Sequence, residues 1–191
     1  FEGNGACRVQ DLALDAAGNL NLTGSMVNTV DFDPGAATLN LTSNGNNDVF
    51  VCQLDAAGNL NWAKNFGGSG SDEAYDLDLD AQGNVYVTGI FRETVDFDPG
   101  PGIVTALANG GTDAFLTQLS PQGNLVRVKV MGGTGNDFGE AVQIAGNGDH
   151  YWAGTFSATT DMDPGAGVSN LVSAGGTDAF LTKLDSNGDF V

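Results

Sequence analysis

The chain has 191 residues, of which 24 are acidic and six are basic, so its formal net charge is −18. This charge argues against nucleic acid or an anionic membrane surface as a partner, and no segment approaches the roughly 20 consecutive apolar residues of a membrane-spanning helix. We therefore expect neither nucleic-acid binding nor membrane insertion. The 29 glycines, with Asn, Asp, Ser and Thr between short apolar runs, are typical of short strands joined by tight turns.

One pentapeptide, Asp-x-Asp-Pro-Gly, occurs three times at a constant spacing of 65 residues, beginning at Asp31, Asp96 and Asp161. Shifting the sequence by 65 residues also aligns glycines, aspartates and apolar residues without a gap, which is the signature of a repeat protein. The repeats are residues 1–65, 66–130 and 131–191, and the last strand of the third repeat is incomplete.

Repeat 2 shows the expected strands most clearly. Its apolar and polar residues alternate, and turn sequences rich in Gly and Asn separate the alternating runs. We expect strands at residues 74–80, 85–91, 113–119 and 125–130. Two hairpins of this kind make four antiparallel strands per repeat, which predicts an all-β protein built from β-propeller blades.

Propellers normally close with about 4–8 blades, so three repeats do not make an ordinary ring. The missing blades would come from the rest of a parent chain or from a second copy of this chain, for example as two chains of three blades. Phe1-Glu2-Gly3 aligns with Phe66-Gly67-Gly68 inside a repeat, so we expect a piece of a longer polypeptide whose ends complement each other across such a junction. A stacked β-solenoid is the alternative, but its coils commonly repeat over about 20–30 residues.

Several smaller features have structural interpretations. Asp-x-x-Gly-Asn segments such as residues 15–19 suit turns that close hairpins, and the glycines at one position of the second strand predict a close approach of a neighbouring chain. Those glycines are Gly24, Gly89 and Gly154. Cys7 and Cys52 are expected two strands apart, too far for a disulfide, so we expect free thiols.

The repeat unit read along residues 67–119 combines Gly-Gly-x-Gly-x-Asp, Asp-x-x-Gly-Asn-x-Tyr-x-Thr-Gly-x-Phe, Thr-Val-Asp-Phe-Asp-Pro-Gly and Gly-Gly-Thr-Asp-Ala-Phe-Leu-Thr-x-Leu. In these motifs all three copies resemble the bacterial β-propeller repeat known as the SBBP repeat. The resemblance implies four-stranded propeller blades, a place in secreted or surface-attached bacterial proteins, and no catalytic residues defined by the repeat. Repeat 3 departs from the pattern at residues 145–149 and at Trp152-Ala153.

The candidate metal ligands are the paired aspartates of the pentapeptide: Asp31, Asp33, Asp96, Asp98, Asp161 and Asp163. Side chains two residues apart in an extended segment point the same way, so each motif projects two carboxylates to one side. Calcium suits such a loop because it takes about 6–8 oxygen ligands, and Asp48, Asp113 and Asp178 would add ligands if their loops meet it. In the alternative, the aspartates only cap turns by accepting hydrogen bonds from backbone amides. The sequence leaves both interpretations open.

The sequence favours no enzyme. His150 is the only histidine, no Gly-x-Ser-x-Gly elbow is present, and a lone histidine beside Tyr151 and Trp152 is better explained by packing. The acidic row Asp76, Asp78 and Asp80 is complete only in repeat 2, since repeat 1 keeps only Asp11 and Asp15 of it. We expect it to form a local polar network facing a channel or a neighbouring blade.

We therefore expect a non-catalytic extracellular or cell-surface propeller module with a structural, adhesive or assembly role, stabilised by calcium if the acidic loops bind it. The alternative is a propeller that binds a glycan or a protein, which exposed aromatic residues around one pocket would favour. Those residues are Tyr75, Tyr86 and Trp152. A hydrolase or lyase would need a polar cluster that breaks the symmetry of the repeats.

Overall fold

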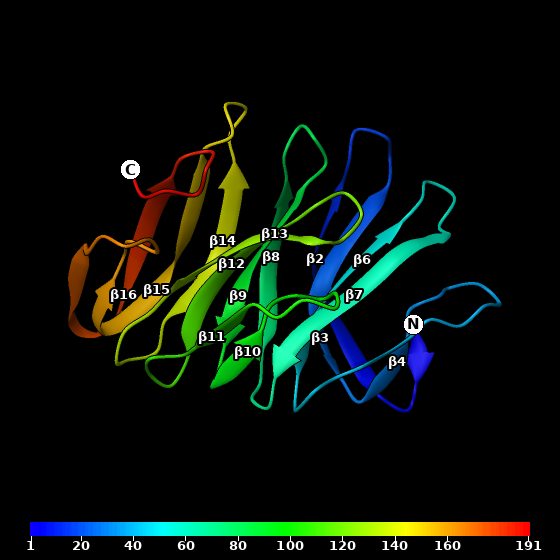
Figure 1. Ribbon diagram of the computed structural model, residues 1–191, viewed down its shortest axis with the longest axis horizontal. Helices are drawn as coiled ribbons and strands as arrows, with labels where there is room; N and C mark the ends of the chain where they lie inside the picture. The colour runs from blue at the N-terminus through cyan, green and yellow to red at the C-terminus, as the bar shows by residue number, and fades with distance from the viewer.

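The computed structural model describes all 191 residues, and every regular element in it is a β-strand (Figure 1). The strands are β1 (Glu2–Gly3), β2 (Ala6–Leu14), β3 (Leu20–Val27), β4 (Thr29–Asp31), β5 (Asn40–Thr42), β6 (Asp48–Leu54), β7 (Leu60–Gly68), β8 (Glu73–Leu79), β9 (Val85–Phe91), β10 (Thr94–Asp96), β11 (Thr105–Leu107), β12 (Asp113–Leu119), β13 (Leu125–Met131), β14 (Phe138–Ile144), β15 (His150–Asp161) and β16 (Asn170–Leu184). The structure has no helix of the length and apolar character needed to cross a membrane.

Each repeat forms one main antiparallel sheet whose strands are paired in chain order. Sheet I contains β2, β3, β6 and β7, sheet II contains β8, β9, β12 and β13, and sheet III contains β14, β15 and β16. The strands expected at residues 85–91 and 113–119 coincide with β9 and β12, and the other two expected strands of repeat 2 differ from β8 and β13 by one residue at their ends. The prediction of an all-β protein is confirmed.

Sheet III has three strands rather than four. Its third strand, β16, pairs only with β15, and beyond it Phe190 makes an isolated bridge with Leu184. The outer edge of β16 therefore lacks the fourth strand that β7 and β13 provide in sheets I and II.

A short hairpin, which the sequence pattern did not predict, carries each Asp-x-Asp-Pro-Gly loop. The hairpin is β4–β5 in repeat 1 and β10–β11 in repeat 2, and it is continuous with β15 and β16 in repeat 3. Strand β10 also pairs with β7, where Asp96 lies opposite Gly67 and Val95 lies opposite Gly68. The hairpin of repeat 2 is thus attached to the sheet of repeat 1.

The first strand of each sheet is irregular at one position, where a glycine faces it from the second strand. In sheet II the register of β8 shifts between Ala74 and Asp76, opposite Gly89. A Cβ atom at Gly89 would lie 1.9 Å from the carbonyl oxygen of Glu73, and Gly24 and Gly154 are equally crowded. The prediction that these glycines permit a close backbone approach is confirmed.

The three sheets stand side by side in an open row, with their first strands, β2, β8 and β14, as neighbours (Figure 1). Strand β8 contacts β2 and β3 of sheet I, and β14 contacts β8 and β9 of sheet II. One apolar cluster joins Val51 of sheet I to Leu77 of sheet II, and a second joins Leu116 of sheet II to Val142 of sheet III. A third cluster, around Phe32, Phe50 and Cys52, lies within repeat 1, so only two of the three clusters lie between sheets.

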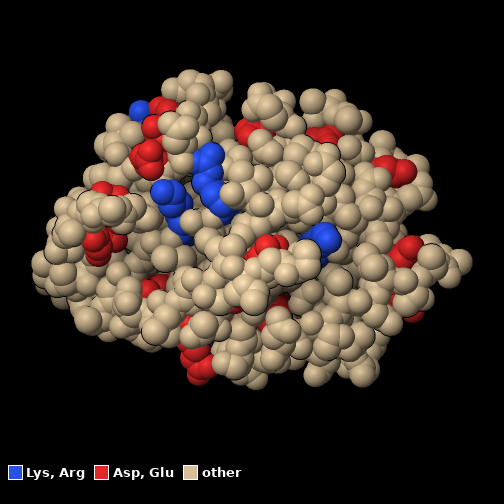
Figure 2. All heavy atoms as spheres, viewed as in Figure 1, with Lys and Arg blue, Asp and Glu red and all other residues tan.

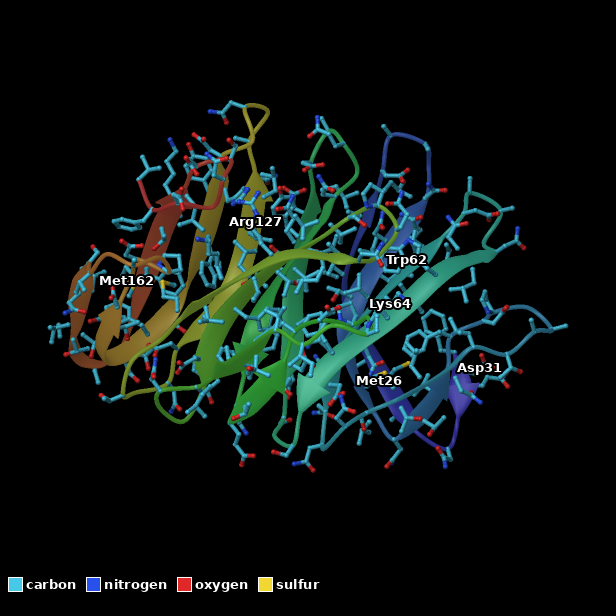
Figure 3. All side chains as sticks on the ribbon, in the orientation of Figure 1. Met26, Asp31, Trp62, Lys64, Arg127 and Met162 are labelled. Atoms are coloured by element: carbon cyan, nitrogen blue, oxygen red, sulfur yellow. The ribbon has the colours of Figure 1, made fainter.

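The fourth strands also reach across to the next sheet (Figure 3). The indole nitrogen of Trp62 in β7 donates a hydrogen bond to the carbonyl oxygen of Pro121 at 3.0 Å, in the last turn of sheet II. The equivalent residue of β13, Arg127, donates from its guanidinium to the carbonyl oxygen of Ser186 at 3.0 Å. Different side chains thus make the same connection at the two junctions.

Candidate functional site

The aspartates of the Asp-x-Asp-Pro-Gly loops form the same backbone hydrogen bonds in all three repeats. In repeat 1, Asp31 Oδ1 accepts hydrogen bonds from the amides of Asp33 at 3.0 Å and Leu39 at 2.8 Å. Asp33 Oδ1 accepts one from the amide of Gly35 at 2.7 Å. The equivalent bonds of Asp96, Asp98, Asp161 and Asp163 differ in length by no more than 0.1 Å. These bonds are the turn caps expected if the aspartates accept hydrogen bonds from backbone amides rather than bind a metal.

In each loop the residue between the two aspartates is buried in the core. That residue is Phe32, Phe97 or Met162. In repeat 1 a third carboxylate is near: Glu2 is the strand partner of Asp31, and with Asp33 they line a hollow of about 210 Å³. No three or more acidic, His or Cys side chains converge closely enough to hold a metal ion. Calcium binding at these loops therefore stays a prediction.

Asp48, Asp113 and Asp178 make their hydrogen bonds away from these loops. Asp48 Oδ2 accepts hydrogen bonds from the Asn44 amide at 2.9 Å and from Asn65 Nδ2 at 3.3 Å, both within repeat 1. Asp113 and Asp178 accept the equivalent amide bonds from Asn109 and Ala174. These aspartates fix the loop before the third strand, so the structure gives them no place among the ligands of an Asp-x-Asp-Pro-Gly loop.

Sequence reasoning missed a second buried aspartate near each of Asp48 and Asp113. Asp72, at the start of repeat 2, is 1% exposed and accepts hydrogen bonds from the amides of Gly68 at 2.8 Å and Arg92 at 3.0 Å. Asp137 takes the same position one repeat later and is fully buried. The sequence signal was the replacement of Cys7 by aspartate at these two positions.

The two aspartates at each junction influence each other electrostatically. Burial raises the pKa of Asp72 to about 6, and the charge of Asp48 adds to that rise. Burial likewise raises the pKa of Asp113 to about 6, with a contribution from Asp137. The Oδ1 atoms of Asp48 and Asp113 are buried and accept no hydrogen bond. The junctions between sheets therefore hold carboxylates that ionise less readily than usual.

The acidic row of repeat 2 also faces a neighbouring sheet. Asp76 Oδ2 accepts a hydrogen bond from the Val142 amide at 2.7 Å, and Asp78 Oδ2 accepts one from the Ile144 amide at 2.6 Å. Asp11 does the same one repeat earlier, accepting from the Leu77 amide at 3.0 Å. These contacts agree with the expected polar network.

His150 is a packing residue, as expected. It is 1% exposed, and its ring lies 4.8 Å from that of Tyr86 between centroids. Burial lowers its pKa, and the nearby charge of Arg127 lowers it further. His150, Tyr86 and Arg127 line a cavity of about 10 Å³, which is the size of a single water molecule.

A larger hollow of about 370 Å³ lies between the turns of sheets II and III. Its lining residues include Asp80, Gln82, Asn147 and Ser186. The aromatic side chains that would favour a glycan site do not line it, since Tyr86 is 4% exposed and Trp152 is fully buried.

Both cysteines are free, as predicted. Cys7 lies in β2 and Cys52 in β6, with β3 between them. Burial raises the pKa of Cys52 to about 12, so this thiol is not reactive at neutral pH.

No family model matches the chain. The chain is similar to the regulatory protein FlaEY of Caulobacter vibrioides, with 32% identity over 113 residues. The match covers 59% of this chain and 11% of that protein's length. The resemblance to the SBBP repeat stays a prediction.

Proposed function

We propose that the chain is an arc of a β-propeller, with sheets I to III as blades, and that it works as a non-catalytic structural or assembly module. One observation carries the proposal: neighbouring blades are joined by the same hydrogen bond one repeat apart. The Leu77 amide donates to Asp11, and the Val142 amide donates to Asp76. Contacts of this kind let blades be added in series, which is how propellers and solenoids grow.

The residues that all repeats share support a structural role. The aspartates of the Asp-x-Asp-Pro-Gly loops cap turns, and those of the junctions hold the loops between blades. The aspartate side chains that the repeats share thus accept hydrogen bonds from the backbone. The resemblance to the SBBP repeat suggests that the module works outside the cell or on its surface, and an antibody against the chain, applied to fractions of the source cells, would test this location.

A propeller that binds a glycan or a protein is the alternative, and the hollow of about 370 Å³ between blades II and III is its candidate site. A ligand that binds only the folded protein raises its stability by RT ln(1 + [L]/Kd), about 2.7 kcal/mol at a hundredfold excess over Kd. Melting curves should be recorded with a panel of soluble glycans and peptides. The structural proposal expects no shift. A ligand-induced shift that is lost in a Gln82→Ala/Asn147→Ala variant would contradict it.

Calcium is the cofactor proposed for the acidic loops. Repeat 1 is the position to test first, because Glu2 lines the same hollow as Asp31 and Asp33 there, although the three carboxylates do not converge in the structure. We expect calcium to raise the melting temperature and EDTA to reverse the rise, with a smaller response in a Glu2→Gln variant. Magnesium at the same concentration controls for screening of the charge. An unchanged melting temperature with calcium and with EDTA would reject the calcium site and leave the turn-capping role.

A further inference from the structure

The first blade exposes part of an apolar face that its counterparts bury, although Leu22, Phe50 and Cys52 on the same face are buried in a cluster of their own. Leu12 in β2 is 56% exposed, whereas Leu77 and Val142, the equivalent residues of repeats 2 and 3, are 5% and 6% exposed. Leu77 and Val142 are covered by the preceding blade, because each belongs to an apolar cluster that spans the junction. We define the N face as the surface of blade I around Val9, Leu12 and Leu14, all of which are exposed.

The third blade exposes the opposite half of the same interface. Leu181 in β16 is 71% exposed, whereas Val51 and Leu116 at the equivalent positions are 0% and 3% exposed. Tyr151 is likewise 39% exposed, against 4% for Tyr86. We define the C face as the surface of blade III around Tyr151, Ala179 and Leu181.

The two faces are complementary, because the chain already joins them twice. A C-type face meets an N-type face between blades I and II, where Val51 packs in one cluster with Leu77. It does so again between blades II and III, where Leu116 and Val142 share a cluster. We propose that the C face of one molecule docks on the N face of a second copy of this chain, in a head-to-tail contact that repeats the internal junction.

The N-terminal residues of blade I occupy the position that the end of the fourth strand of a preceding blade occupies at the internal junctions. Phe1 packs on Phe32 with ring centroids 4.8 Å apart, as Phe66 packs on Phe97 at 5.7 Å. Strand β1 pairs with β4 in the register in which the end of β7 pairs with β10. The N face therefore presents the contacts that a C-type face meets inside the chain.

The docked junction would differ from the internal ones in two ways. Cys7 stands where Asp72 and Asp137 stand, so the carboxylate of Asp178 would meet a thiol rather than a second carboxylate. Ala141 stands where Asp11 and Asp76 stand, so the hydrogen bond across the blades is lost. The net charge of the chain is −18, and acidic side chains outnumber basic ones on the face shown in Figure 2. The two copies therefore repel each other, and salt should strengthen the contact.

A head-to-tail contact is heterologous, and this property gives a sharp test. The solution mass should be measured by light scattering at protein concentrations up to about 1 mM and at about 0.15 M and about 0.5 M NaCl. We expect the wild-type chain to associate, more strongly at the higher salt concentration. Leu12→Asp should destroy the N face and Leu181→Asp the C face, each weakening self-association at least about tenfold.

An equimolar mixture of the two variants decides the orientation. The intact C face of Leu12→Asp should dock on the intact N face of Leu181→Asp. The mixture should therefore form a one-to-one complex under conditions in which each variant alone associates much more weakly than the wild type. Ile103→Asp is the matched control, because Ile103 is 78% exposed on the Asp-x-Asp-Pro-Gly loop of repeat 2, outside both faces. Circular dichroism should show that all three variants remain folded.

Two results would overturn the proposal. A wild-type chain that stays monomeric at both salt concentrations would mean that a second copy does not cover these faces. Dimers that survive both substitutions would place the contact elsewhere on the molecule. The inference rests on the proposed structural function. A monomeric chain that also binds no ligand would contradict only the head-to-tail contact. A ligand-induced shift in melting temperature would contradict the structural function itself.

Discussion

At the scale of single residues, the shared aspartates and glycines act through the backbone. The carboxylate of Asp15 accepts hydrogen bonds from the amides of Ala17 at 2.9 Å and Asn19 at 2.8 Å. In repeat 3 Ala145 replaces the aspartate, yet the Gly148 amide still bonds to the Ala145 carbonyl at 2.8 Å. The glycine with positive φ, rather than the aspartate, is therefore the essential residue of this turn.

Gly89→Ala should strongly destabilise the protein, because the new methyl group would meet the carbonyl oxygen of Glu73 at 1.9 Å. We expect the free energy of unfolding to fall by at least about 2 kcal/mol. Gly146→Ala is the control, since a Cβ atom there meets nothing within 4 Å and should change stability by no more than about 0.5 kcal/mol. Urea denaturation would measure both, and equal midpoints would contradict the prediction.

At the scale of elements, the contact between sheets II and III adds a unique hydrogen bond to one that sheets I and II each make internally. Thr88 in β9 donates its hydroxyl proton to the Phe115 carbonyl at 2.8 Å, as Thr23 donates to the Phe50 carbonyl at 2.9 Å. Thr88 also accepts a hydrogen bond from the Trp152 indole of sheet III at 2.7 Å, which Thr23 does not. The repeat thus supplies its own matched control for the contact between sheets II and III.

Thr88→Val should cost more stability than Thr23→Val, because only the first substitution leaves the buried indole N–H of Trp152 without an acceptor. We expect a difference of about 1–3 kcal/mol in the free energy of unfolding. Trp152→Phe removes that donor, so the double variant Thr88→Val/Trp152→Phe should cost less than the sum of its single changes. Equal costs for the two threonine variants would show that the indole bond contributes nothing.

At the scale of the whole molecule, buried carboxylates make the stability of this strongly negative chain depend on pH. Burial raises the pKa values of Asp72 and Asp113 to about 6, against about 3.9 in an unfolded chain. The folded state therefore holds these protons more tightly. Their contribution to stability is fully present below about pH 4 and is lost as the pH rises through about 6.

We expect the melting temperature to be higher at pH 5 than at pH 7. The double variant Asp72→Asn/Asp113→Asn should reduce this difference, because the amide groups do not titrate. Asp189→Asn controls for the change in net charge, since the Asp189 side chain is 74% exposed. If the melting temperature differs between pH 5 and pH 7 by as much in the double variant as in the wild type, Asp72 and Asp113 are not the cause of the pH dependence.

The local order of the chain was determined by the sequence. The 65-residue spacing, the alternation along strands such as β9 and β12, and the turn residues define the repeats, the hairpins and the free cysteines, because these depend on neighbouring residues and on strand order. Only the tertiary structure decided which groups meet across repeats. It brought Asp72 and Asp137 to buried junctions, directed Asp76 and Asp78 to sheet III, and left Leu12 and Leu181 uncovered. These outcomes depend on how one sheet packs against the next, and a pattern that looks alike in every repeat does not contain that information.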